Sequence, residues 1–444
     1  MVTNKTVKFF TSDNSNAPQL QNASGSLITL LDACLVTGIQ VGVINSLSST
    51  GLEATAVFGL PHNLKKYQVV RVSGATQAEY SGDFKIKQVV NATTIKFELN
   101  SVASVANASG TINCMLAPLN WDKPFSSSTA LGGGRAAYRS KDETLPNRPF
   151  LRVVDERISS YGINYAKYAK VGIVEEMTGI DVMQGVQAPY IASATTRNWN
   201  PTGSGVNIKN GWAKWYYYTL GEYNVDSTSL VDYETENRSW MVIGTESAFY
   251  ILNGVDNQKN ISDEEKELAF CYGFGAFNPI ADDDLFTHYL LASNAWEIAQ
   301  GAQYRMGSYT RDVVLGSEDY ANTTSGRSVF LQRGYKKSAY AQATCRKVTL
   351  EPGTNTVSGG STSYVVNSDV FGGVVIQTPL VLEVTASSQA HPRGFLPLIK
   401  TIPHKAHYNN VQLIEEGDLV LLTKHVRGTN SIPLGVVLFD LGEQ

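Results

Sequence analysis

The sequence predicts a mainly β protein: a β-rich α+β chain with several domains, antiparallel sheets or small barrels, and few short helices. Charged residues make up only 17% of the 444 positions, and Gly (38) and Tyr (22) are abundant. An average globular chain has about 25% charged residues. In addition, short runs of β-branched and aromatic residues alternate with turns rich in Ser, Thr, Asn and Gly. The length predicts about three domains.

The pattern of runs and turns divides the chain into four segments. Residues 1–58 form an N-terminal segment that holds a helix and continues after an inserted module. Residues 59–115 are that insert, a small antiparallel β module. Residues 116–335 form a central aromatic-rich β domain, and residues 336–444 form a C-terminal β domain.

The clearest predicted helix covers residues 24–39. Ser26 is placed to cap its start and Gly38 to end it. Apolar residues recur at i, i+3, i+4 and i+7. They are Leu27, Ile28, Leu30, Leu31, Cys34 and Leu35. Such a stripe predicts packing in a core or an interface, not catalysis.

The insert is predicted from three short strands at 67–74, 83–90 and 93–100, joined by polar turns. In the last two, apolar and charged residues alternate, as expected of strands with one buried face. The stretch 70–90 contains no candidate nucleophile, metal ligand or phosphate loop. We therefore expect a self-contained structural module, a compact barrel or sandwich.

The rest of the chain predicts further strands. Gly132, Gly133 and Gly134 lack the preceding strand and the Lys-Ser/Thr pair of a phosphate-binding loop, so we expect a flexible linker or a contact loop there. Residues 170–183 predict a strand followed by a short helix. The other predicted strands and hairpins are 149–156, 237–254, 270–277 (whose glycines allow close approach of another backbone), 363–386 and 418–441.

Composition argues against several classes of function. A net charge of −4 gives no electrostatic case for nucleic acid binding. No apolar run approaches the roughly 20 residues that span a bilayer, and the N-terminus lacks the pattern of a signal peptide. The four isolated cysteines form no CxxC pair. We expect them to be small buried hydrophobes in a protein made in a reducing cytoplasm.

No catalytic residue, cofactor site or metal site is predicted. His391, His404, His407 and His425 could bind a metal if they met, but their spacing matches no known ligand pattern. The acidic runs 256–267 and 281–286 lack the alternating ligands of a calcium loop. No spacing singles out a glycosidase carboxylate pair, and there is no GxSxG motif.

Residues 210–220 hold a dense aromatic stretch. Aromatic rings can stack on a sugar or a base, but packing in a core or between subunits is their more common role. Together with the leucines of the predicted helix, this stretch supplies the predicted contact residues between subunits. These are Leu27, Leu30, Leu31, Trp212, Trp215, Tyr216, Tyr217 and Tyr218.

Six motifs follow one another in a recognisable order: "GSLITLLDACL", "NWDKPFSSSTA", "PFLRVVDE", "NRSWMVIGTESAFYILNG", "FCYGFGAF" and "HPRGFLPLI". This order resembles a group of virion structural proteins from the tail or baseplate region of tailed bacteriophages. In that group a Trp-led hairpin precedes a Gly-Phe-Gly strand, matched here by Arg238–Trp240 with Phe249–Tyr250 and by Gly273–Gly275. Arg393–Leu398 with His404 matches a C-terminal motif, but lacks its second glycine.

The resemblance implies a building block of a phage particle. Its expected partners are other virion proteins and copies of itself, in a threefold or sixfold ring, with its location in the virion after synthesis in the host cytoplasm. Residues 59–115 are similar to a small β-module that recurs in phage virion proteins, and we expect them at the periphery. The family carries no catalytic residues that could be transferred.

Two other hypotheses stay open. A receptor- or carbohydrate-binding protein at the particle's tip would present an exposed aromatic platform such as Tyr216–Tyr218. A glycan depolymerase or a metal-dependent hydrolase would depend on Asp282–Asp284 or on His404. Both differ from the structural hypothesis in requiring a site that contacts a host glycan.

Overall fold

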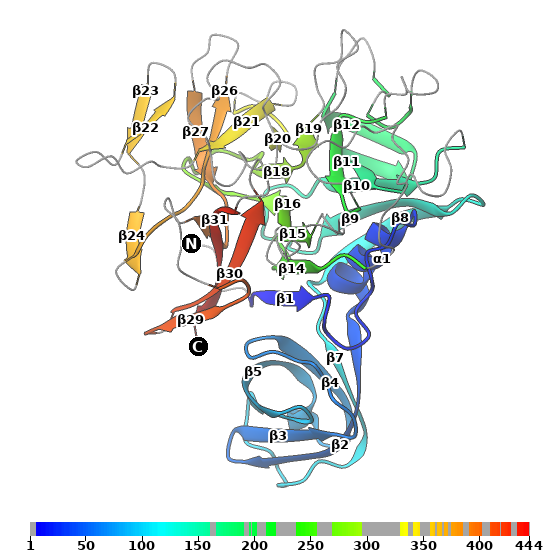
Figure 1. Ribbon diagram of the computed structural model, residues 1–444, viewed down its shortest axis with the longest axis vertical. Helices are drawn as coiled ribbons and strands as arrows, with labels where there is room; N and C mark the ends of the chain where they lie inside the picture. Colours follow the sequence, from blue (N-terminus) through cyan, green and yellow to red (C-terminus); the bar gives the residue numbers. More distant parts are fainter. Residues whose placement is uncertain are drawn as a thin grey trace.

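The computed structural model describes residues 6–159, 166–190, 195–196, 198–201, 210–218, 237–254, 269–294, 329–335, 341–346, 356–359, 362–365, 368–371, 374–384, 390–401, 409–417, 419–427 and 433–443. This part of the chain is mostly β, with antiparallel pairing in several sheets, a closed barrel and one short α-helix (Figure 1). The predicted fold class is confirmed.

The barrel lies at one end of the long axis of the molecule (Figure 1). Its strands close in the order β2-β3-β6-β5-β4-β7. They are β2 (Ile39–Thr50), β3 (Glu53–Phe58), β4 (Val69–Ala75), β5 (Gly82–Asn91), β6 (Thr94–Glu98) and β7 (Gly110–Leu116), with a 3-10 helix, η2 (Ala78–Tyr80), between β4 and β5. Alternation places Ile95 and Phe97 of β6 inside the barrel.

The boundary predicted for the insert differs from the barrel's own. The barrel begins at Ile39, not at residue 59, because closure of the ring requires β2 and β3. β2 pairs with β7, and β3 pairs with β6. The sequence pattern identified the strands at 67–100 but could not show which earlier strands complete the ring.

The predicted helix begins as α1 (Ser26–Leu31) and continues as a π-helix, η1 (Asp32–Thr37). Gly38 follows with φ 80°, as expected for the glycine that ends it. The predicted start differs, because Gly25 rather than Ser26 occupies the N-cap position. The Ser26 hydroxyl instead donates a hydrogen bond to the Ala23 carbonyl at 2.7 Å.

A seven-stranded sheet follows the barrel. Its strands are β8 (Trp121–Ser128), β9 (Gly133–Ser140), β10 (Phe150–Glu156), β11 (Tyr168–Gly179), β12 (Val182–Ala188), β13 (Ala213–Tyr216) and β19 (Ser293–Asn294).

Two predictions are corrected in this sheet. The three glycines at 132–134 form the end of the β8–β9 hairpin, where Gly132 and Gly133 adopt positive φ, and not a flexible linker. Residues 170–183 form most of β11 and the start of β12, with no helix, because the chain reverses after Gly179 and pairs back onto β11.

Sixteen described strands form the largest sheet, which is antiparallel except where β16 meets β30. They are β1 (Lys8–Thr11), β14 (Trp240–Gly244), β15 (Ala248–Gly254), β16 (Ala269–Ala276), β17 (Asn278–Pro279), β18 (His288–Leu291), β20 (Val329–Leu331), β21 (Ala341–Arg346), β24 (Ser368–Phe371), β25 (Val374–Gln377), β26 (Leu380–Val384), β27 (Ala390–Phe395), β28 (Ile399–Thr401), β29 (Leu413–Glu416), β30 (Leu419–Arg427) and β31 (Pro433–Glu443). A separate hairpin comprises β22 (Thr356–Gly359) and β23 (Thr362–Val365).

Strands β15 and β16 are interior strands of this sheet, each paired on both edges, and are buried on both faces. Phe249 packs into the core shared with the seven-stranded sheet, α1 and the barrel, whereas Tyr250 packs into the core on the opposite face. A Cβ on Gly275 would lie 2.3 Å from the Ala248 Cα, so the predicted close backbone approach is confirmed. The structure also confirms the hairpin predicted at 237–254, which is formed by β14 and β15.

Candidate functional site

The eight predicted contact residues lie in the interior of the chain. Leu27, Leu30 and Leu31 are fully inaccessible to solvent, and no member of the aromatic group between 212 and 218 exceeds 3% exposure. The prediction that these side chains contact a neighbouring subunit is therefore corrected, because their partners belong to the same chain. The apolar stripe was consistent with a core or an interface, and the fold uses it as core.

The aromatic stretch joins the two large sheets. The Trp215 indole N–H donates to the Leu291 carbonyl at 2.7 Å, and its ring stacks with Tyr272 at a centroid distance of 6.1 Å. Tyr217 donates its hydroxyl to Asp155 Oδ1 at 2.9 Å. Tyr216–Tyr218 therefore form no exposed platform for a glycan, which corrects that part of the carbohydrate-binding hypothesis.

Asp155 on β10 is a buried carboxylate that the sequence reading did not select. Its Oδ2 accepts a hydrogen bond from the Leu27 backbone N–H at 3.1 Å, at the start of α1. Burial raises its pKa to about 6, although hydrogen bonds from the helix start and from Tyr217 oppose this shift. With all these partners in the same chain, Asp155 serves to anchor α1 on the sheet.

The residues that motivated the metal and hydrolase hypotheses do not converge where they are described. His391 is exposed, whereas His404, His407, the side chain of His425 and the run 256–267 lie outside the described residues. Asp282 and Asp283 are exposed, but Asp284 is buried in an ion pair with Arg393. Among the described side chains, no group of three or more His, Cys, Asp or Glu is placed to hold a metal ion.

Three of the four cysteines, Cys34, Cys114 and Cys271, are free and buried. Burial raises the pKa of each thiol, to about 12 for Cys114. A thiol that stays protonated is a poor nucleophile, so these residues are small apolar groups of the core, as predicted.

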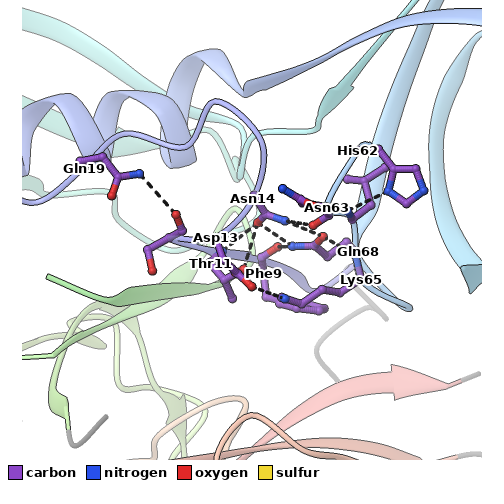
Figure 2. Close-up of polar contacts among 11 residues, drawn as sticks. Phe9, Thr11, Asp13, Asn14, Gln19, His62, Asn63, Lys65 and Gln68 are labelled. Atoms are coloured by element: carbon purple, nitrogen blue, oxygen red, sulfur yellow. Dashed lines mark hydrogen bonds and ion pairs between the residues drawn. The ribbon is translucent and has the colours of Figure 1, made fainter. Parts of the chain in front are cut away.

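A network of buried polar contacts forms the junction between the barrel and the body, where the body means the two large sheets with α1. Figure 2 shows its centre, the paired side-chain amides of Asn14 from the body and Gln68 from the barrel. Gln68 Nε2 donates to Asn14 Oδ1 at 2.9 Å, and Asn14 Nδ2 donates back to Gln68 Oε1 at 3.1 Å. Both side chains are buried.

The same two amides also satisfy backbone groups on both sides of the junction. Gln68 Nε2 donates to the carbonyl of Phe9 on β1 at 3.2 Å, and Gln68 Oε1 accepts from the Lys65 N–H at 2.8 Å (Figure 2). Asn14 Oδ1 accepts from the Thr11 N–H at 2.9 Å, and its Nδ2 donates to the Asn63 carbonyl at 3.0 Å. The network fixes the barrel at the first strand of the body.

Charged residues reinforce this amide pair. Lys8 of β1 contacts Asp83 of β5 at 3.0 Å and donates to the Pro118 carbonyl at 2.8 Å. Arg71 of β4 donates to both carboxylate oxygens of Asp83, at 2.6 and 3.0 Å. Burial alone would raise the pKa of Asp83, but the hydrogen bonds from Arg71 and Lys8 outweigh it and keep the pKa below its ordinary value.

Further contacts join the barrel to other parts of the body. Lys65 pairs with Asp13 at 2.6 Å, and Lys66 pairs with Glu415 on β29 at 2.7 Å. A cleft of about 450 Å³ lies beside the Lys8–Asp83–Arg71 group. It is lined by Thr6, Lys8, Val69, Arg71, Asp83, Lys85, Leu119, Asn120, Thr245 and Glu246. The cleft carries charges of both signs, so it favours no single class of charged ligand.

Replacing Gln68 by alanine is expected to lower the free energy of unfolding by about 2–3 kcal/mol. The change removes the buried hydrogen bonds from Gln68 to the Phe9 carbonyl and to the Asn14 amide, although Asn14 keeps its bonds to Thr11 and Asn63, and each buried group that loses a partner costs roughly 1–3 kcal/mol. Urea unfolding measures the loss, and amide hydrogen exchange should show faster opening of β1.

Gln19→Ala is the matched control for this change. Gln19, labelled in Figure 2, is a half-buried glutamine of the same region, but the partners of its amide among the described residues are the nearby Ser12 and Ala17 carbonyls. We expect a loss well below that of Gln68→Ala. Equal losses of unfolding free energy for the two variants would show that the Gln68 contacts across the junction stabilise the fold no more than local hydrogen bonds do.

The sequence offered little signal for this junction. Asn14 and Gln68 are ordinary polar residues 54 positions apart, and neither belongs to a recognisable motif. One usable hint is that Gln68 stands at the start of an apolar strand, where a buried amide needs a partner.

Comparisons with known proteins place the chain in no family. No family model matches it, and no curated protein matches it. Among solved structures, an endosialidase of phage phi92 is similar to it with 12% sequence identity and a TM-score of 0.15, over 85% of this chain and 72% of that chain. No helix in the described part of the chain has the length and apolar character to cross a membrane.

Proposed function

We propose that this protein is a structural component of the tail or baseplate region of a tailed phage, joined to copies of itself and to other virion proteins in an oligomeric ring. The observation that carries the proposal is the junction: a closed barrel at one end of the molecule, held by a buried amide pair and several ion pairs. A module fixed in this way can present its outer surface to a neighbour at a constant angle.

The use of charged groups supports a structural role over a catalytic one. Arg393 binds Asp284 through two hydrogen bonds, at 2.7 and 2.9 Å, and also contacts Glu383. Asp155 is engaged by α1 and Tyr217. These buried ionic groups hold distant segments of the chain together. The resemblance of the sequence motifs to phage virion proteins agrees with this role.

The test is assembly of the particle. In a phage that encodes this chain, particles made without it are expected to be incomplete and non-infectious, and the wild-type chain supplied in trans should restore both properties. Electron microscopy of the labelled subunit should show it in the tail region. Intact, infectious particles without the chain would overturn the proposal.

A variant of the exposed carboxylates separates the structural role from the hydrolase alternative. Asp282→Asn with Asp283→Asn leaves the buried Asp284–Arg393 pair in place. The structural role predicts full restoration of infectivity by this double variant. A hydrolase that uses these carboxylates predicts complete particles that cannot degrade the host polysaccharide.

A further inference from the structure

One surface of the barrel carries no charge. We call it the neutral face, and define it as residues 39–52, which contain β2, and residues 99–116, which contain β7 and the loop before it. Neither segment contains Asp, Glu, Lys or Arg. All charged residues in the strands of the barrel lie on the other four strands, β3, β4, β5 and β6. These charges are Glu53, Arg71, Asp83, Lys85, Lys87, Lys96 and Glu98.

The two segments of the neutral face lie side by side. Gln40 pairs with Met115 and Val43 pairs with Asn113 between β2 and β7. Farther along β2, the Ser49 N–H donates to the Ala106 carbonyl at 2.8 Å, so the loop before β7 continues beside β2. The absence of charge is therefore a property of one continuous side of the barrel.

The neutral face also exposes large apolar side chains. The exposed fractions are 38% for Leu52, 63% for Val102 and 46% for Val105, with Val43 at 51% farther along β2. The Leu99 N–H donates to the Leu52 carbonyl at 2.8 Å, which places the start of the loop next to the β2–β3 turn. Apolar groups with little charge around them are typical of the centre of a protein interface.

Hydrogen bonds from the interior of the barrel hold the loop that carries Val102 and Val105 in place. The buried Tyr80 hydroxyl lies 2.9 Å from the carbonyl oxygens of Val105 and Ala106 and 2.7 Å from Ser49 Oγ. At the rim, Glu79 accepts a hydrogen bond from the Ser104 N–H at 3.1 Å. A loop ordered before binding loses less conformational entropy when a partner docks.

We propose that the neutral face docks against the same face of a second copy of this chain, an inference that rests on the proposed oligomeric role. Contact between like faces pairs two copies about a twofold axis, and such pairs are the units from which the ring is built. A partner with a strongly charged surface would lose hydration there without gaining an ion pair. The same face of another copy has no such cost, since it brings neither like-charge repulsion nor an unpaired charge. Each copy offers this face at the same orientation, because the junction fixes the barrel on the body.

The experiment places charge on this face. Val102→Lys with Val105→Lys adds four like charges to a contact between two such faces. Wild-type chains are expected to associate in sedimentation velocity over a concentration series, and the double variant to associate at least about tenfold more weakly. Both positions are exposed, so the isolated chain should keep its fold and its melting temperature.

Val90→Lys is the matched control. Val90 is 45% exposed and lies on β5, which stands opposite β2 in the ring order. Its substitution should leave association unchanged. Wild-type chains that stay monomeric, or a double variant that associates like the wild type, would overturn the proposed docking surface.

Incorporation into particles separates this proposal from the proposed function. A chain that is present in particles but stays monomeric in solution would disprove docking of a second copy while leaving the structural role intact. A chain that associates through the neutral face but is absent from particles would disprove the structural role alone.

Discussion

Replacement of Arg393 by methionine is expected to lower the free energy of unfolding by about 3–5 kcal/mol. Arg393 and Asp284 have side chains only 1% and 2% exposed, and the guanidinium also contacts Glu383 and the carbonyl of Phe286. Methionine occupies much of the same space but leaves two carboxylates without a counter-ion. Breaking a buried ion pair by removing one partner is among the most destabilising changes in a protein.

Thermal and urea unfolding measure this effect, with Arg71→Met as the matched control. Arg71 also binds an aspartate through two hydrogen bonds, but its side chain is 44% exposed, and exposed pairs contribute about 1 kcal/mol or less. A loss for Arg393→Met no greater than that for Arg71→Met would refute the expected effect. Because Arg393 connects β27 to the segment before β18, hydrogen exchange should show the largest changes there.

The second large effect expected is loss of stability in acid caused by His288. This residue on β18 is fully buried, and neither ring nitrogen has a hydrogen-bond partner among the residues that the structure describes. Burial lowers its pKa to about 3, against an opposing contribution from Asp142. The folded state therefore keeps the ring neutral, whereas the unfolded chain binds a proton near pH 6.5.

The sign follows from proton binding. Between pH 6.5 and pH 3 the unfolded state holds more protons than the folded state, so stability falls as the pH falls through this window. The shift corresponds to a loss of about 3 kcal/mol between neutral pH and pH 4. His288→Gln removes the titrating ring, and should flatten this part of the curve of unfolding free energy against pH.

His391→Gln is the control, because the His391 ring is exposed to water in the folded chain as well. We expect its curve to follow that of the wild type. A His288→Gln curve as steep as the wild type between pH 6.5 and pH 4 would show that other groups dominate acid unfolding. Asp155 acts in the opposite sense: its raised pKa favours the folded state at low pH, and that contribution is lost as the pH rises through about 6.

Several elements were predictable from local pattern. The alternation in 93–100 predicted β6, and the run of apolar residues around a "GTES" turn predicted the β14–β15 hairpin. Such patterns are local, because a strand's two faces are set by the direction of successive side chains. The helix at 24–39 was also visible, although its division into an α-helix and a π-helix was not.

Partners across the fold were not predictable. Asn14 and Gln68 meet across 54 positions, and Arg393 and Asp284 across 109. Arg393 lies in a motif and Asp284 in an acidic run, but nothing in the sequence pairs them or pairs Asn14 with Gln68, since any amide or carboxylate elsewhere in the chain was an equal candidate. The predicted short helix after residue 170 was wrong for a similar reason: pairing of β12 with β11 decided that segment, not its own propensity.

The sequence by itself determined the β class, the periodicity of the individual strands and the presence of a small β-module, because each depends on residues close together in the chain. Only the tertiary structure decided that the helix leucines and the aromatic stretch at 212–218 are core, that β2 and β3 complete the barrel, and that one side of it is without charge. Burial and pairing depend on which distant segments meet. That outcome is a property of the packed chain as a whole.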